Sequence, residues 1–314
     1  MYPKRLILMG ALLVLCAGLY MTLGAKGSWG FILPYRGQKL AALMLVGVSV
    51  STATVLFQTI TQNRILTPSI MGFDALYVLL LTLLVFVLGG QTYVQLPAIG
   101  QFLLNTGLLM AASVALFGSL LGRGRVDLMR MILTGIIFGV LFRSLTGFMQ
   151  RMIDPNEYAV IQSGSFARFN QIETSLLGMS TLLTFVALIA VWSIRHRLDV
   201  LALGHTGAVN LGENPKRATF LVLVLVALLV SVSTALVGPV AFLGLLVVSL
   251  AHLITPTPRH VILLPSAALV AMIVLVGGQT ILERVLALST PLSVVVDVLG
   301  GLLFLILLLK GTTR

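Results

Sequence analysis

The stretch TFLVLVLVALLVSVSTALV, Thr219–Val237, contains no charged residue, no proline and no glycine. Its nineteen residues match the roughly 20 apolar residues that an α-helix needs to cross a bilayer. The rest of the chain has the same character, since its 314 residues are 58% hydrophobic and 9% charged, with a mean hydropathy of +1.10. Soluble domains carry about 25% charged residues. The apolar excess must therefore face lipid, which excludes a disordered chain, a collagen, a disulfide scaffold and an ordinary cytosolic enzyme.

Nine further apolar runs accompany this one along the chain. They are Leu6–Leu23, Lys39–Thr61, Ala75–Leu88, Phe102–Leu121, Met129–Phe148, Ser175–Ile194, Val240–Ile254, Val261–Val276 and Val294–Leu309. The third, eighth and ninth of the ten runs are short. Ten spans of roughly 20 residues leave only connections and tails. The sequence predicts an all-α integral membrane protein of ten transmembrane helices, with residues 1–314 forming a single domain.

Basic residues indicate how the chain sits in the membrane. Lys and Arg number 20 against nine Asp and Glu, which gives a net charge of +11. They fall between the apolar runs, where membrane proteins keep cytoplasmic positive charges, so we expect no nucleic-acid partner. With the N-terminus inside, thirteen lie on the inner side and six on the outer side. We therefore expect both termini to be cytoplasmic and the first run, which follows Lys4 and Arg5, to be a retained helix rather than a signal peptide.

Catalytic and nucleotide-binding motifs are missing from the sequence. It contains no GxxxxGK[ST], no HExxH and no CxxC, and Cys16 is its single cysteine. We expect solvated or interfacial positions for its four histidines, His196, His205, His252 and His260. The chain is accordingly predicted to be no enzyme and to bind no cofactor itself.

Three connections between the runs have distinct compositions. The outer one, residues 150–174, contains the turn signal Asp154-Pro155-Asn156. The inner one, Arg195–Arg217, reads RHRLDVLALGHTGAVNLGENPKR and predicts two short amphipathic helices joined by a glycine turn. The third, Gly277–Leu292, predicts a short outer helix that does not span.

Polar residues within the apolar runs are candidates for a substrate path. Burying a charge at the bilayer centre costs on the order of 3 kcal/mol, so such residues usually face the bundle interior or a cavity. Arg143, Ser144 and Gln58 are nominated on this ground. An Arg143–Asp297 ion pair, or an arginine that reaches the interface, is an equally weighted alternative for Arg143. Gly135 and Gly139 form a GxxxG pattern, which favours close packing within the chain.

Three stretches together resemble FecCD/BtuC-type permeases, the membrane subunits of iron–siderophore, haem and cobalamin ABC importers. They are LPYRGQKLAALMLVGVSVSTATVLFQTITQNRILTPSIMG (Leu33–Gly72), LDVLALGHTGAVNLGENPKR (Leu198–Arg217) and GPVAFLGLLVVSLAHLI (Gly238–Ile254). They occur in the family's order and spacing. The resemblance implies a BtuC-like bundle of ten transmembrane helices in a bacterial cytoplasmic (inner) membrane.

The same resemblance implies partners. A second permease, identical or homologous, would share the translocation path, two ABC ATPases would carry ATP and Mg on their own chains, and a periplasmic or lipoprotein binding protein would deliver the ligand. The ATPase contacts would fall within residues 198–213, on Leu201, Ala202, Leu203, Gly204, Ala208, Leu211 and Gly212. The binding protein would dock on Arg36, Lys39 and Arg284, and Asn63 matches a family position near the inner gate.

The sequence indicates the family more specifically than it indicates the transported ligand. Asp154–Tyr158 (DPNEY), after the arginine-bearing fifth run, is similar to the subset that handles catecholate siderophores. Departures include Arg64, where the family often has proline, and 249–252 (SLAH) in place of Pro-His-x-x-Arg. We therefore expect a ferric siderophore permease, with haem or cobalamin as alternative ligands. A secondary transporter driven by an ion gradient is the rival class, for which Asp297 is the one carboxylate within the predicted spans.

Overall fold

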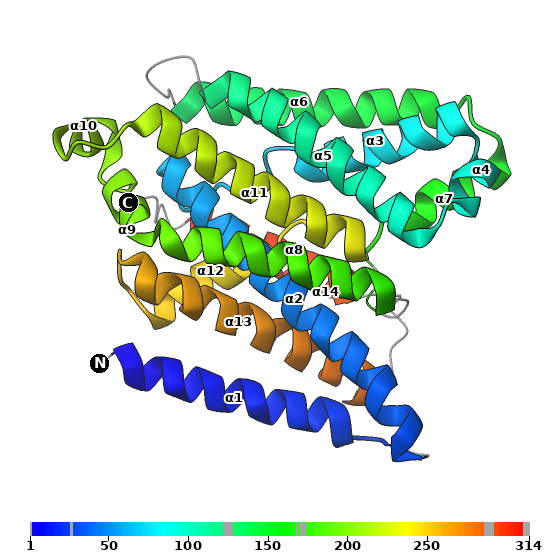
Figure 1. Ribbon diagram of the computed structural model, residues 1–314, viewed down its shortest axis with the longest axis horizontal. Coiled ribbons are helices and arrows are strands. Elements are labelled where there is room, and N and C mark those ends of the chain that lie inside the picture. The colour runs from blue at the N-terminus through cyan, green and yellow to red at the C-terminus, as the bar shows by residue number, and fades with distance from the viewer. Residues whose placement is uncertain are drawn as a thin grey trace.

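The computed structural model describes residues 2–25, 28–121, 128–167, 169, 174–285 and 292–309. Every regular element within those ranges is a helix, as the sequence predicts (Figure 1). The N-terminal half holds α1 (Tyr2–Thr22), α2 (Trp29–Thr61), α3 (Phe73–Leu88), α4 (Gly90–Gln95), α5 (Ala98–Leu121), α6 (Leu128–Gln150) and α7 (Pro155–Gly164). The C-terminal half holds α8 (Thr174–Ser193), α9 (Arg195–Leu201), α10 (Gly204–Asn210), α11 (Pro215–Val237), α12 (Leu243–Ile254), α13 (His260–Thr280), the π-helix η1 (Ile281–Val285) and α14 (Leu292–Leu309).

Each of the ten apolar runs coincides with one helix. Within the described ranges, seven helices are long and apolar enough to cross a membrane, namely α1, α2, α5, α6, α8, α11 and α13. The other three, α3, α12 and α14, are shorter apolar helices. The 12 residues of α12 extend about 18 Å at 1.5 Å per residue, which is less than the ~30 Å of the hydrocarbon core. On its own, α12 is therefore too short to cross the hydrocarbon core.

The ninth run differs from its prediction. It was expected to be short, with a separate short helix within Gly277–Leu292, but α13 continues past Gly277 and Gly278 to Thr280 and then into η1. A Cβ on Gly277 would lie 3.6 Å from Cys16 Sγ, and one on Gly278 would lie 3.2 Å from a Leu292 methyl group. Other helices therefore pack closely against these two glycines. Glycine weakens a helix, and this packing compensates by stabilising the end of α13. Residues 286–291 lie outside the described part.

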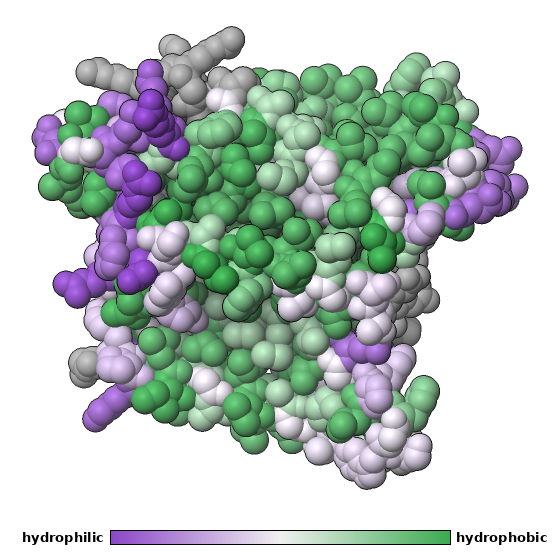
Figure 2. Space-filling model, in the orientation of Figure 1, coloured by the Kyte–Doolittle hydropathy of each residue, from purple (hydrophilic) through white to green (hydrophobic). Residues whose placement is uncertain are grey.

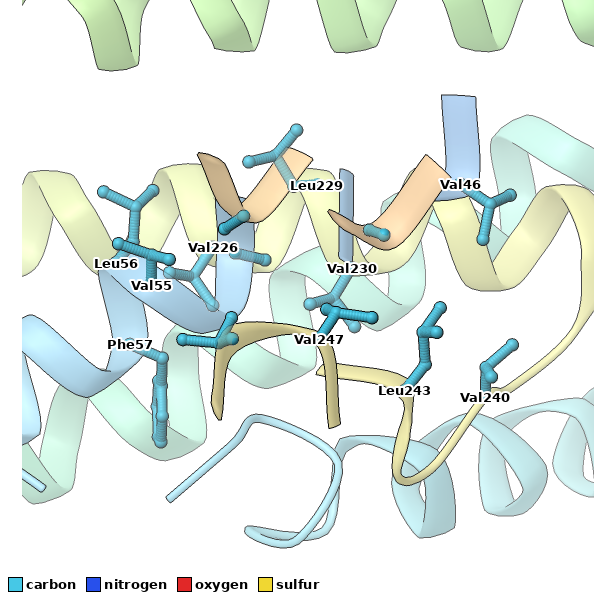
Figure 3. Packing of buried hydrophobic residues seen from close by; sticks show 14 of the residues in the cluster. Val46, Val55, Leu56, Phe57, Val226, Leu229, Val230, Val240, Leu243 and Val247 are labelled. Atoms are coloured by element: carbon cyan, nitrogen blue, oxygen red, sulfur yellow. The ribbon is translucent and has the colours of Figure 1, made fainter. Parts of the chain in front are cut away.

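The core forms where α2 and α11 cross the middle of the molecule. Figure 3 shows valine, leucine and phenylalanine side chains of α2 and α11 packed against Val240, Leu243 and Val247 of the α12 segment. Small residues bring the backbones together: a Cβ on Gly47 would approach the Ala271 carbonyl carbon to 3.2 Å. A Cβ on Gly244 would lie 2.1 Å from Thr54 Oγ1. Both helices are buried on most sides along their central turns, and those turns contain no charged residue.

Two non-helical segments, residues 62–72 and 238–242, run beside this core. Leu66 and Met71 are almost completely buried, with 3% and 1% of their surface exposed. Non-helical backbone is tolerated at membrane depth only where protein buries it or where it lines a cavity. These segments precede α3 and α12, which explains why both helices are short.

The molecule has two polar ends separated by an apolar band, which Figure 2 shows on one face. At one end lies the elbow, defined here as residues 195–213, which comprises α9, α10 and their connections. The start of α1 lies there too, since the Tyr2 hydroxyl donates to the Pro256 carbonyl at 2.9 Å. At the opposite end, the Gly90 N–H donates to Glu157 Oε1 at 2.8 Å and joins α4 to α7. The described basic residues of the elbow end include Arg5, Arg64, Arg195, Arg197, Lys216, Arg217 and Arg259.

Candidate functional site

A cavity of about 720 Å³ opens in the half of the molecule away from the elbow. Helices α3, α6 and α14 form its walls, together with the end of α7 and the segment before α12. Its polar lining consists of Asp74, Arg143, Thr146, Gln150, Gln162, Ser165, Ser293 and Asp297. Apolar residues make up the rest of the lining, and a mostly apolar cavity of this size with a few converging polar groups can hold a small ligand.

Three charged side chains reach this cavity from three helices. Asp297 Oδ1 on α14 accepts a hydrogen bond from the Phe242 N–H at 3.0 Å, and this bond caps the start of α12. Asp74 Oδ1 on α3 accepts from the Ser69 hydroxyl at 3.2 Å, and its Oδ2 is buried without a partner among the described residues. Arg143 on α6 is exposed to the cavity. Within the described part of the chain, no ion pair of 4.0 Å or less joins Arg143 to either carboxylate.

The turn at Gly72 brings Asp74 to the cavity. Gly72 has φ +100°, and a Cβ there would lie 3.3 Å from the Gly139 Cα of α6. A Cβ on Gly135 would meet the Met71 side chain at 2.6 Å. The GxxxG pattern of α6 therefore packs within the chain, as predicted, and receives the turn that starts α3 halfway along α6. Sequence reasoning missed Asp74 because the predicted run began at Ala75; an acid two residues after a glycine, at the head of an apolar helix, was the available signal.

The other nominated path residues lie elsewhere. Ser144 is exposed on α6 but does not line the cavity. The Gln58 amide donates to the Arg64 carbonyl at 2.5 Å, and Asn63 Oδ1 accepts from the Ile65 N–H at 2.9 Å. Both shape the chain reversal after α2 at the elbow end. Of the four nominated residues, the structure brings only Arg143 to the cavity.

The elbow has the predicted form of two short helices joined at a glycine. Gly204, between α9 and α10, has φ +86°, and Gly212, after α10, has φ +80°. The leucines at the turn and at the end of α10 point outward, with Leu203 64% and Leu211 62% exposed.

Two of the residues assigned to ATPase contact face inward instead. Leu201 is 6% exposed and Ala208 is fully buried, because the inner faces of α9 and α10 pack on the bundle. These two residues anchor the elbow. A partner seated on it would touch Leu203 and Leu211, together with Ala202 and Gly212.

Polar contacts tie the elbow to the bundle. The Arg197 guanidinium pairs with Glu213 at 2.9 Å and closes the elbow on itself. Of the solvated or interfacial positions expected for His260, the solvated one is excluded, because this residue at the start of α13 is 2% exposed. Its ring nitrogens contact Asp199 of α9 at 2.6 Å and Thr59 of α2 at 2.7 Å. The histidine is buried because both ring nitrogens find partners there.

The basic residues assigned to the outer rim differ in exposure. Arg36 is only 5% exposed, and its guanidinium donates to the carbonyls of Tyr20, Met21, Leu23 and Gly24 at 2.8–3.1 Å. Those carbonyls end α1, where a helix lacks internal partners, so Arg36 is a C-terminal cap rather than an exposed docking contact. Lys39 lies 4.5 Å from the Tyr35 ring centre. Arg284 pairs loosely with Glu283 at 3.5 Å and keeps 25% of its side chain exposed.

One face of α6 is apolar and exposed. It carries Leu133, Ile136, Ile137, Val140 and Leu145. Arg143 lies on the same helix beside the cavity. In the described ranges, no three His, Cys, Asp or Glu side chains converge as metal ligands would.

Comparisons with known proteins agree on one family. The model of the FecCD transport family matches residues 5–310. The petrobactin import system permease protein YclO of Bacillus subtilis is 42% identical over 307 residues, 98% of this chain and 97% of that protein. The petrobactin permease FatC of Bacillus anthracis is 31% identical over 86% of this chain and 77% of its own length. A solved structure described as an inward-facing metal-chelate type ABC transporter has a TM-score of 0.83 at 23% identity and covers 99% of this chain and 100% of its own.

Proposed function

The chain belongs to the FecCD transport family, and from this premise we propose that it is the membrane-spanning permease subunit of an ATP-driven importer for a ferric siderophore. The observation that carries the proposal is the 42% identity to a petrobactin permease over nearly the whole of both chains. Relatives named for hydroxamate and haemin import share less, at 30% and 27%. The ligand of this chain is accordingly a siderophore rather than haem or cobalamin.

A catecholate siderophore is the ligand class that we propose. Petrobactin is a catecholate siderophore, and two petrobactin permeases are among the relatives of this chain. The cavity also holds the carboxylates of Asp74 and Asp297, which accept hydrogen bonds from Ser69 and from the Phe242 N–H. Neither forms an ion pair with Arg143 among the described residues, so the guanidinium is available to an anionic group of a chelate. A fixed cation on the path attracts an anionic ligand and repels cations.

The partners follow from the surfaces left open. A second permease, identical or homologous, would cover the apolar face of α6 and complete the cavity beside Arg143. Two ABC ATPases would seat on the elbow through Leu203 and Leu211, and ATP and Mg would stay on those chains. A periplasmic or lipoprotein binding protein would dock at the opposite end, where Lys39 and Arg284 carry positive charge that can steer its approach.

Orientation follows from charge. The elbow end gathers most of the described basic residues, and positive charge marks the cytoplasmic side. We therefore place the elbow and both termini in the cytoplasm, with the chain in the bacterial cytoplasmic (inner) membrane. The cavity then lies in the outer half of the molecule, on the side of the binding protein.

The test is to purify the chain with its bound partners and assay ATP hydrolysis with ferric petrobactin, a ferric hydroxamate and haemin in turn. We expect co-purified ATPase chains, and stimulation by the ferric catecholate above the other two. Uptake that needs no ATP and collapses with an ionophore would favour the secondary transporter instead. Stimulation by haemin alone would overturn the siderophore.

A further inference from the structure

Three polar side chains from three helices meet beneath the elbow. Asp199 lies on α9, His260 opens α13, and Thr59 lies in the last turn of α2. The His260 Nδ1–H donates to Asp199 Oδ1 at 2.6 Å, and His260 Nε2 shares a hydrogen bond with the Thr59 hydroxyl at 2.7 Å. One histidine ring therefore connects the elbow to two transmembrane helices.

Asp199 forms more than one hydrogen bond with α13. Asp199 Oδ1 also accepts from the backbone N–H of His260 at 2.8 Å, so the carboxylate caps α13 from a different helix. The start of a helix has unpaired N–H groups and a partial positive charge, both of which favour a carboxylate. The histidine side chain is only 3% exposed, whereas the side chain of Asp199 is 32% exposed, so the ring is buried and its carboxylate partner lies at the protein surface.

A second contact joins the elbow directly to α2. The Gln62 amide, one residue after α2 ends, donates to the Leu201 carbonyl at the end of α9, at 3.4 Å. Gly204 follows with φ +86°, and a Cβ there would lie 3.0 Å from that amide nitrogen. The glycine therefore lets the elbow turn lie against the end of α2.

Helices α2 and α13 can carry a displacement onward because they pack tightly against each other. A Cβ on Gly47 would touch the Ala271 backbone at 3.2 Å. Farther along, Val46, Val50 and Thr54 of α2 line a small enclosed pocket that Asp74 also lines. The part of α2 that packs on α13 therefore lies beside a pocket that Asp74, a residue of the larger cavity, also lines.

We propose that Asp199, His260 and Thr59 are positioning residues that transmit movement of the elbow to α2 and α13 during transport. The proposal rests on the proposed function, in which ATPases move the elbow through Leu203 and Leu211. Closely packed helices shift as rigid bodies, and hydrogen bonds between packed side chains can carry such a shift from one site to another. The hydrogen bonds of His260 are such a link, whereas the outward leucines only receive the ATPase.

The experiment compares substitutions that keep or remove the link in the reconstituted complex. Thr59→Val removes the hydroxyl and keeps the shape, whereas Thr59→Ser keeps the hydroxyl. Asp199→Asn weakens the other half of the link, and His196→Gln is its matched control because His196 is exposed on the same helix. The readout is ferric petrobactin transported per ATP hydrolysed. We expect about a tenfold fall for T59V and D199N, within the usual range of coupling between sites, and wild-type ratios for T59S and H196Q.

A second readout needs no chelate. Spin labels on Trp29→Cys at the far end of α2 and Tyr158→Cys on α7, in a Cys16→Ser background, report movement of α2 when ATP is added. We expect the ATP-dependent change in label distance to disappear in T59V and D199N while the ATPases stay bound. Wild-type distance changes in both variants would overturn the proposal. So would variants that only lower the amount of assembled complex and keep the wild-type transport ratio.

Leu203→Asp separates this inference from the proposed function. It should release the ATPases, because a charge would replace an exposed apolar contact. ATPases that stay bound to L203D would refute the proposed seat on the elbow, whatever T59V does. If L203D loses the ATPases but the T59V complex keeps the wild-type ratio of transport to ATP hydrolysis, the role of His260 and its partners is refuted and the proposed function stands.

Discussion

At the scale of single residues, two arginines with similar neighbours in the sequence have different surroundings in the structure. Arg36 and Arg143 both sit within or beside apolar runs. Four carbonyls at the end of α1 surround the Arg36 guanidinium, whereas Arg143 faces a cavity. A buried arginine with four carbonyl acceptors stabilises structure, while one exposed to a cavity is available to a ligand.

Replacing Arg143 should impair transport without affecting assembly. Arg143→Ala removes the cation that faces the cavity, and we expect chelate-stimulated transport to fall about tenfold or more, as for loss of a charge-assisted contact. Ser144→Ala, at the exposed neighbouring position, is the control. The measurement is transport by equal amounts of assembled complex. Unchanged uptake, or a subunit that fails to fold, would refute the assignment.

Replacing Arg36 should impair stability. Arg36→Met keeps the length of the side chain and leaves the end of α1 uncapped, which should lower the free energy of unfolding by roughly 3 kcal/mol. Arg5→Met removes an exposed contact to the Ile254 carbonyl and should cost less than about 1 kcal/mol. Thermal unfolding of the purified permease measures both. Unaltered unfolding of R36M combined with weaker binding-protein affinity would restore the docking role.

At the scale of elements, the positions where the short helices α3 and α12 begin depend on how the segments before them pack. Helix α3 begins halfway along α6 because the Gly72 turn lies against Gly139. Helix α12 begins after Gly238, where a Cβ would lie 2.8 Å from the Phe166 carbonyl oxygen. Both glycines have φ +100°, which side chains rarely adopt. The cavity between α3, α6 and α14 therefore depends on these two turns.

Adding one methyl group at Gly72 should destabilise the protein and distort the cavity. Gly72→Ala forces an alanine into the left-handed region, at a cost of about 1–2 kcal/mol, and crowds Gly139. Gly107→Ala in α5 is the matched control: nothing lies within 4 Å of the added Cβ, and alanine favours a helix by about 0.5–1 kcal/mol. Unfolding midpoints should therefore shift in opposite directions. A G72A protein as stable as G107A would contradict this account of the turn.

At the scale of the whole molecule, the distribution of apolar and basic residues distinguishes the two ends from the middle. An apolar band separates a basic elbow end from an opposite end that carries α4 and α7 (Figures 1 and 2). Apolar side chains lie exposed on α6 and on the elbow. Lipid can cover an apolar helix face, whereas Leu203 and Leu211 of the elbow are exposed beyond the band, where we propose that the ATPases bind.

The sidedness of the two ends can be measured directly. In a Cys16→Ser background, His196→Cys marks the elbow and Asn156→Cys marks α7; both positions are exposed. We expect a membrane-impermeant maleimide added to intact spheroplasts to label N156C and to spare H196C until the membrane is permeabilised. The reverse labelling pattern would place the elbow outside the cell and refute the proposal that the ATPases bind it.

The sequence predicted the elements well and the contacts between them poorly. All ten apolar helices, the glycine-jointed elbow and the Asp154 turn, which caps the start of α7, follow from local composition. Asp74 was missed because the predicted run began at Ala75. His260 and the burial of Arg36 were missed because their hydrogen-bond partners lie on other helices or beyond a helix end. His260 contacts Asp199 and Thr59, which are 61 and 201 residues distant. No local pattern can report such partners.

Composition alone decided that this chain lives in a bilayer as an all-helical bundle, because the free energy of placing each apolar run in lipid depends mainly on that run itself. Tertiary structure alone decided which charged groups share the cavity and which side chains tie the elbow to α2 and α13. Those choices depend on where helices approach one another, and that is determined by the packing of small residues such as Gly72 and Gly244 against distant backbone and side chains.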